Sequence, residues 1–267
     1  EAMSVVISRV DESDIKLVSP AHIEEVLKFV AGSGVQRGNG QEYLPALRSQ
    51  VFTGAGACGE LLTAEDGIPL RAAGFCNINE LFEAHAEMAQ RIEVLKGPGS
   101  VLYGSNAVHG VINVIPPDTS RGAGMVGVDY GAYGYKRAKL RQGKDFGNSG
   151  IGINASITRN SGYRDGESVQ QEKVNLRHRY ETDDLMLTTG FTYTNLDQDT
   201  AGYISGFESY KVEDLARSNE NPDAFRKNRA VRLWTNAKWD LADDAQLSIT
   251  PYFRNQSMDF RMHFLPG

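Results

Sequence analysis

The chain has 267 residues, of which 40% are hydrophobic and 23% are charged, a composition that argues against intrinsic disorder. The net charge of -6 at pH 7, without a run of Lys or Arg, argues against a nucleic-acid partner. No stretch of 18 consecutive apolar residues predicts a membrane-spanning helix.

The first 119 residues mix short apolar runs with Gly-rich turns, which is typical of a small α+β domain. Residues 21–29 place Ile23, Val26 and Leu27 at helical spacing after a Ser-Pro start signal. A second helix is predicted over residues 79–89, with Asn77 or Asn79 as its cap. Strands are predicted over residues 4–8, 92–95 and 110–115.

Residues 120–267 instead indicate a series of strands with alternating polar and apolar side chains. We expect these strands at 123–131, 135–145, 150–160, 168–181, 185–196, 227–240 and 246–260. On the apolar side we place Ile151, Ile153, Ile157, Leu185, Leu187 and Phe191, and on the polar side Asn154, Ser156, Thr158, Thr188 and Thr192. A soluble sandwich gives the same alternation, so this pattern alone does not identify a membrane barrel.

The lengths of the predicted connections favour an outer-membrane arrangement. The connections after the second, fourth and sixth strands are short, whereas those after the other strands vary in length. The connection at 197–226 is rich in polar residues, which leaves two interpretations open. It is either a disordered insertion or an ordered loop that contacts a ligand.

The most specific segment is residues 90–115, which read QRIEVLKGPGSVLYGSNAVHGVINVI. Short apolar pieces flank two turns, at Gly97-Pro98-Gly99 and at Gly104-Ser105-Asn106, where glycine permits positive φ or close backbone approach. A phosphate-binding loop is a weak alternative, because the Gly-Lys-Ser/Thr ending is missing.

This segment closely resembles the end of the plug domain of TonB-dependent receptors, and Asp66-Gly67-Ile68-Pro69 resembles an earlier plug motif. The matching positions are Asp66, Gly67, Arg91, Glu93, Gly97, Pro98, Tyr103, Gly104, Gly110 and Asn113. His109 stands where the family has glycine, and we interpret it as a substituted turn residue rather than as a metal ligand or an acid-base group.

The resemblance implies an α+β plug domain followed by antiparallel strands of an incomplete transmembrane β-barrel. We expect the plug at residues 1–119 and the first strands of the outer-membrane β-barrel at 120–267. Because such barrels have about 22 strands, we expect that a longer chain was truncated. The implied function is import of a scarce ligand, such as a siderophore-metal complex, with TonB as periplasmic partner and outer-membrane lipid around the barrel. Neither an enzymatic activity nor a cofactor is expected.

Candidate ligand contacts follow from the same resemblance, in the loops expected at the outer end of the plug. We predict that Arg37 and Arg71 pair with an anionic ligand, and that Tyr43, Phe52 and Phe75 stack on a ring. The alternative is that both arginines pair with carboxylates of the protein.

The two cysteines, Cys58 and Cys76, lie 18 residues apart in the expected plug. Oxidising conditions in the cell envelope favour a disulfide, and free buried thiols are the alternative. The alternative functions are a soluble β-rich binding or adhesion module, and an enzyme that uses His109 or Cys58. The sequence offers no partner base or metal ligand near either residue.

Overall fold

A computed structural model describes residues 6–38, 40–49, 61–70, 82–104 and 107–261. The chain forms two compact units, and the second begins at Asp118. This boundary lies two residues before the predicted one. No described helix is long and apolar enough to cross a membrane.

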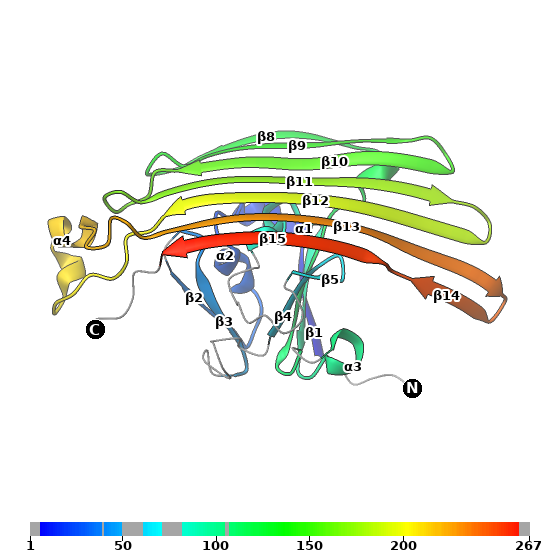
Figure 1. The fold of residues 1–267 in the computed structure, drawn as a ribbon, viewed down its shortest axis with the longest axis horizontal. Helices are drawn as coiled ribbons and strands as arrows, with labels where there is room; N and C mark the ends of the chain where they lie inside the picture. Colours follow the sequence, from blue (N-terminus) through cyan, green and yellow to red (C-terminus); the bar gives the residue numbers. More distant parts are fainter. Residues whose placement is uncertain (1–5, 39, 50–60, 71–81, 105–106, 262–267) are drawn as a thin grey trace. The chain divides into compact units, whose positions relative to one another are not determined.

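The first unit is built on a five-stranded mixed sheet (Figure 1). Its strand order is β1 (Val6–Asp11), β6 (Arg91–Lys96), β7 (Gly110–Ile115), β4 (Leu61–Glu65) and β5 (Ile68–Pro69). The β4–β7 pair is parallel, and the other pairs are antiparallel. A separate hairpin pairs β2 (Ser33–Arg37) with β3 (Tyr43–Leu47).

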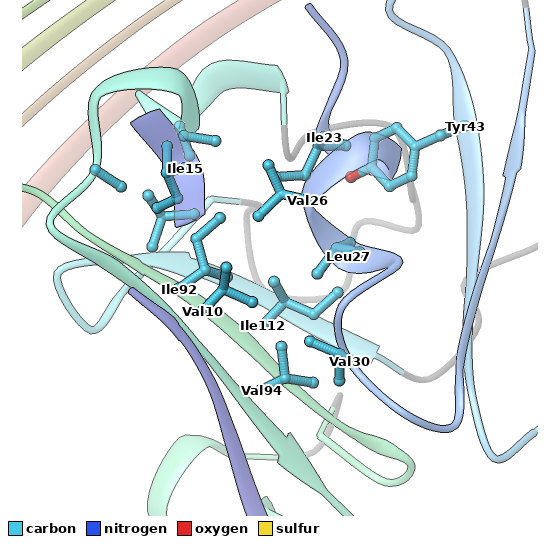
Figure 2. Packing of buried hydrophobic residues seen from close by; sticks show 14 of the residues in the cluster. Val10, Ile15, Ile23, Val26, Leu27, Val30, Tyr43, Ile92, Val94 and Ile112 are labelled. Carbon is cyan, nitrogen blue, oxygen red and sulfur yellow. The ribbon is translucent and has the colours of Figure 1, made fainter. Parts of the chain in front are cut away.

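Short helices accompany this sheet: α1 (Glu12–Val18), α2 (Ile23–Leu27), the 3-10 turn η3 (Ala86–Met88) and α3 (Ser100–Tyr103). In the hydrophobic core, Val26 and Leu27 of α2 belong to one buried cluster with Ile92, Val94 and Ile112 of the central strands (Figure 2). The helical spacing in the sequence therefore predicted both α2 and its buried side.

The predicted helix at 79–89 is not an α-helix over its described part, where Phe82, Glu83 and η3 adopt short 3-10 turns. Glu83 is buried there along with Phe82, Ala84 and His85. A segment that is buried nearly all round has no solvent-facing stripe. The backbone N–H of His85 instead donates to the Glu65 carboxylate, at 2.9 Å.

The second unit begins with the short 3-10 turn η4 (Thr119–Arg121) and continues as an antiparallel sheet in which consecutive strands pair from β8 to β14 (Figure 1). Its strands are β8 (Ala123–Tyr130), β9 (Lys136–Asp145), β10 (Ser149–Asn160), β11 (Ser168–Glu181), β12 (Leu185–Asp199), β13 (Phe225–Ala242), β14 (Ala245–Ile249) and β15 (Tyr252–Arg261). The single strand predicted at 246–260 is thus two strands, both paired with β13. Pro251 lies at the break, where proline cannot donate to the ladder.

The two faces of this sheet have opposite chemistry. Ile151 and Ile157 are 52% and 53% exposed, whereas Asn154, Ser156 and Thr158 on the same strand are nearly fully buried. The same holds on β12, where Thr188 and Thr192 are buried. The predicted division of the strands into an apolar and a polar face is therefore confirmed for these residues, and the buried face is the polar one.

Candidate functional site

Two motifs that lie far apart in the sequence meet in the first unit. The turn between β4 and β5 contains Asp66 and Gly67, both at positive φ, at 54° and 78°. The N–H of Gly67 donates to the side-chain oxygen of Asn113 at 3.0 Å, and the N–H of Asp66 donates to the Val114 carbonyl at 2.8 Å. Asn113, in β7, is thus the residue through which the later motif fixes the earlier turn.

Glycines in the later motif allow β6 and β7 to approach closely. Gly97 has a φ of 108°, and its N–H donates to the His109 carbonyl at 3.0 Å. Gly110 has a φ of 157°, and a Cβ there would lie 2.3 Å from the carbonyl oxygen of Leu95. The backbone contact at His109 agrees with its interpretation as a turn residue.

The polar members of the motif make local contacts. Arg91 Nε donates to Glu93 Oε1 at 2.6 Å, and both residues lie on β6. Tyr103 ends α3, where burial and then the nearby Glu93 carboxylate raise the pKa of its hydroxyl above the ordinary value. Gly104 follows at a φ of 86° and ends that helix. These contacts hold turns and strand ends in place.

A second group of polar contacts joins α2 to the β2–β3 hairpin. His22 caps α2, because its Nδ1 accepts the N–H of Glu24 at 3.1 Å. Its Nε2 then carries the proton and faces the Glu42 carbonyl at 3.2 Å. Arg37 Nη1 pairs with Glu25 Oε1 at 3.3 Å, so this predicted ligand contact has a carboxylate partner. Tyr43 lies edge-on to His22 and is 1% exposed, a core position that does not fit the predicted stacking on a ligand.

We predict that His22 makes the first unit less stable in acid. Burial, followed by the charge of Arg37, lowers the pKa of His22 from 6.5 to about 4. Below pH 6.5 the unfolded chain binds a proton that the folded chain does not, so stability falls as the pH drops towards 4. The loss is about 3 kcal/mol for a pKa difference of this size.

The matched variant is His22→Asn, whose side-chain oxygen also caps a helix but does not titrate. Unfolding of the first unit within the intact protein, followed at pH 7 and at pH 4, should show the extra loss only with histidine. Equal losses in the two proteins would contradict this role of His22.

The other predicted site residues cannot be placed. Phe52, Arg71, Phe75, Cys58 and Cys76 all lie outside the described residues, so both the predicted ligand contacts there and the disulfide remain predictions.

Three connections at one end of the second unit are joined by side chains. Tyr133 and Tyr163 lie edge to face with ring centroids 5.3 Å apart, and the Arg217 guanidinium lies 5.9 Å from the Tyr163 ring. Arg164 Nη2 donates to the Ser218 carbonyl at 2.5 Å. Because residues 200–224 also contain η5 (Ser209–Lys211) and α4 (Glu213–Arg217), the connection predicted at 197–226 is an ordered loop rather than a disordered insertion.

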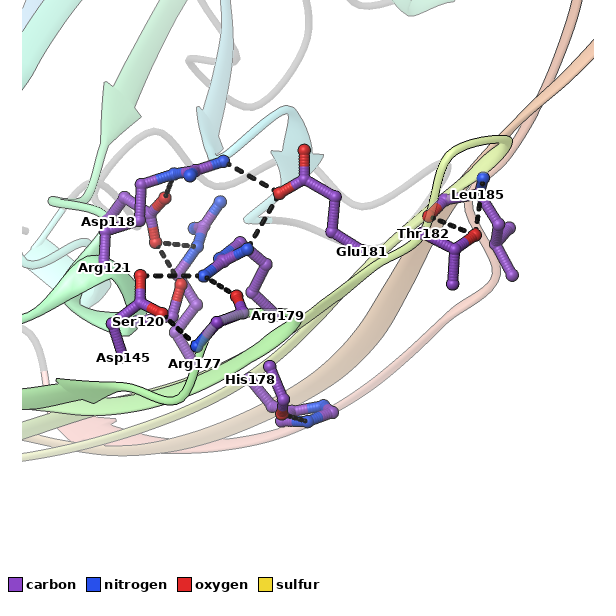
Figure 3. Close-up of polar contacts among 12 residues, drawn as sticks. Asp118, Ser120, Arg121, Asp145, Arg177, His178, Arg179, Glu181, Thr182 and Leu185 are labelled. Carbon is purple, nitrogen blue, oxygen red and sulfur yellow. Dashed lines mark hydrogen bonds and ion pairs between the residues drawn. The ribbon is translucent and has the colours of Figure 1, made fainter.

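A charged cluster at the start of the second unit was not predicted. Asp118 and Arg121 contact charged residues of β11, namely Arg177 and Glu181 (Figure 3). The sequence does contain a signal for it: Gly150 and Gly152 share the parity of the polar face, and they are paired with Arg179 and Arg177. Glycines beside arginines on a buried polar face indicate that something packs closely there.

Comparison with known proteins assigns a family to the first unit and shows the fold of the second. Residues 1–111 match the family described as the TonB-dependent Receptor Plug Domain. The vitamin B12 transporter BtuB of Vibrio vulnificus is 28% identical over 178 residues, which are 66% of this chain and 28% of that protein. The chain thus spans well under half the length of this relative.

Solved structures share the fold across both units. The siderophore receptor PiuA from Acinetobacter baumannii superposes with a TM-score of 0.74 at 19% identity, over 96% of this chain and 37% of that one. The ferric citrate transporter FecA, in its unliganded form, gives a TM-score of 0.81 at 17% identity, over 97% of this chain and 41% of that one. The first unit therefore carries the plug domain of TonB-dependent receptors, and the antiparallel strands that follow it share the fold of the strands in these solved receptors and transporters.

Proposed function

We propose that the whole protein imports a scarce ligand, such as a siderophore-metal complex, across the outer membrane with energy delivered by TonB. The observation that carries this proposal is the plug motif, in which Asn113 fixes the Asp66-Gly67 turn, joined to a sheet whose buried face is polar. Related proteins are named as a vitamin B12 transporter and as a siderophore receptor.

The opposite chemistry of the two sheet faces argues against a soluble binding module. A soluble sheet buries its apolar face, because apolar area is stabilised by removal from water. Here apolar side chains on one face of the sheet are exposed, including Val126, Val128, Ile151, Ile157, Leu233, Trp239 and Phe253. Contact with hydrocarbon stabilises such a face, and a polar interior can satisfy the other one.

Ligand contacts are proposed at Arg37 and Arg71, and at the aromatic side chains Phe52 and Phe75. The Arg37–Glu25 pair does not oppose this role, because both side chains are partly exposed, at 43% and 30%. A pair with that exposure contributes about 0–1 kcal/mol, so an anionic ligand can compete with Glu25 for the guanidinium. Separately, the connection between β12 and β13 in the second unit presents exposed aromatic rings, at Tyr203, Phe207 and Tyr210.

Uptake of radiolabelled ferric citrate and of radiolabelled cyanocobalamin by cells that carry the full-length receptor tests the proposal. We expect one of these probes, or another metal chelate in a wider panel, to enter only when TonB is present and the inner membrane is energised. Uptake that is equal without TonB would indicate a passive pore instead.

The role of Arg37 is tested by measuring how tightly the full-length receptor binds a transported probe, once such a probe is known. For an anionic probe, Arg37→Gln should weaken binding by about tenfold, the effect of losing about 1.4 kcal/mol of a charge-assisted contact. The matched control is Lys28→Gln, which removes another exposed, paired cation of the plug, the partner of Glu24. Equal effects of the two changes would show that Arg37 has no specific part in binding.

A further inference from the structure

The segment Asp118–Arg121, which enters the second unit from the plug, lies on the polar face of the sheet in a space made by three glycines. A Cβ on Gly143 would lie 1.7 Å from the Thr119 carbonyl oxygen, and one on Gly150 would lie 1.9 Å from that of Ser120. A Cβ on Gly152 would lie 2.2 Å from Thr119 Oγ1. Only glycine at these positions lets the segment lie directly on β9 and β10, and Thr119 and Ser120 are at most 1% exposed there.

Charged side chains fasten both ends of the segment to β11 (Figure 3). At one end, Asp118 pairs with Arg177 at 3.5 Å and accepts hydrogen bonds from Ser120 at 2.5 Å and from Arg121 at 3.0 Å. At the other end, Arg121 Nη2 pairs with Glu181 at 3.3 Å.

Arg179 connects this cluster to β9. Its Nη1 donates to Glu181 at 2.8 Å, and its Nη2 donates to Asp145 at 2.9 Å, while its side chain is 5% exposed. The Arg177 guanidinium lies 5.6 Å from the centre of the Trp234 ring, and that ring packs on Gly190 of β12. The segment is therefore held by a row of contacts that runs from β9 to β13.

The direction of the chain gives this arrangement a mechanical consequence. β8 begins at Ala123, just after the segment, and among the described strands it pairs with β9. Tension that reached β8 through its first residue would break its ladder one hydrogen bond at a time. Tension that first reaches residues 118–121 is instead shared among contacts on several strands at once.

We propose that Asp118–Arg121 is a mechanical anchor, which prevents a force on the plug from separating β8 from β9. The need for an anchor rests on the proposed function, in which TonB pulls on the plug. Its mechanical strength can be measured without TonB or ligand. During transport, this segment remains bound to β9 and β10, and the chain after Asp118 does not unfold.

The test is force spectroscopy on the full-length receptor in a lipid bilayer, pulled by its N-terminus. For the native chain we expect extension to stop once the residues ahead of Asp118 are extended. In Gly152→Ala the added Cβ displaces Thr119, so residues 118–135 should also detach from the sheet. Their detachment should lengthen the measured extension by about 60 Å, at about 3.4 Å per residue. Gly124→Ala is the matched control, since its added Cβ meets only a side-chain atom at 4.0 Å, and it should behave as the native chain does.

A second variant keeps the backbone unchanged in case Gly152→Ala does not insert. Replacing both Arg121 and Arg177 with glutamine removes three of the charged contacts, those of Arg121 with Asp118 and Glu181 and that of Arg177 with Asp118, and should also give the longer extension. Native and variant receptors that stop at the same extension, or a native receptor whose β8 already peels, would overturn the proposal. Because no transport is measured, failure of the anchor and failure of the proposed import function remain distinct results.

Discussion

Gly110→Ala is expected to destabilise the plug by about 3 kcal/mol, through strain at a positive φ together with a steric clash. The φ of Gly110 is 157°, a conformation that residues with a side chain rarely adopt. The clash is with the Leu95 carbonyl oxygen, at 2.3 Å, and that oxygen belongs to the neighbouring strand. A backbone atom in a paired strand cannot rotate away, so β6 and β7 must separate or shift.

Hydrogen exchange of the intact receptor measures this effect. Peptides from β6 and β7 should exchange about a hundredfold faster in the variant, which is the factor that corresponds to a change of about 3 kcal/mol in local opening. Gly34→Ala in β2 is the matched control, because nothing lies within 4 Å of its added Cβ. If Gly110→Ala leaves the exchange of both strands as slow as Gly34→Ala does, the close approach of these strands does not require glycine.

The parts of the fold that the sequence predicted well are those where one physical requirement dominates. Alternation along β10 and β12 predicted which side chains are buried, because a strand turns every second residue to the same face. The helical spacing of Ile23, Val26 and Leu27 predicted α2 for a similar reason. Asp66-Gly67 was recognised as a motif, and its turn is held by a hydrogen bond from Gly67 to Asn113.

The missed features depend on contacts between residues that are distant in the sequence. Glu83 and His85 were assigned to a helix, although their burial belongs to an irregular segment in which the His85 N–H donates to Glu65. The β2–β3 hairpin was also missed, since its strands are short and β3 contains Pro45. At the candidate ligand site, a carboxylate partner for Arg37 is one of the two alternatives that the sequence leaves open, but nothing in the sequence places Tyr43 in the core.

The contacts of the anchor segment were also missed because they join residues that are distant in the sequence. Asp118, Arg121, Arg177 and Glu181 are ordinary charged residues in the sequence, and only the register of β9, β10 and β11 brings them together. Gly143, Gly150 and Gly152 are the sequence signal for this packing, because a Cβ on any of them would overlap residue 119 or 120.

Arginine at position 153 is expected to cost about 2–4 kcal/mol and to lower the amount of inserted receptor, if Ile153 faces hydrocarbon near the membrane midplane. Ile153 shares the parity of the exposed Ile151 and Ile157, and it is paired with Leu176, which is 44% exposed. Leu241→Arg is the matched control, because Leu241 is an exposed apolar residue at the end of β13. Near the membrane surface the cost of arginine falls to about 0–1 kcal/mol.

Ser156→Arg provides the comparison with the polar face. Ser156 is 4% exposed and is paired with Lys139 on one side and Lys173 on the other. Arginine there crowds two cations but does not enter hydrocarbon, so its defect should be sensitive to salt and to loss of a neighbouring lysine charge. The amount of each receptor inserted into the outer membrane, and its unfolding in lipid at low and high salt, separate the two effects. If Ile153→Arg inserts as well as Leu241→Arg, or if salt relieves its defect as it relieves that of Ser156→Arg, the apolar face of β10 does not contact lipid and the assignment of the two faces is reversed.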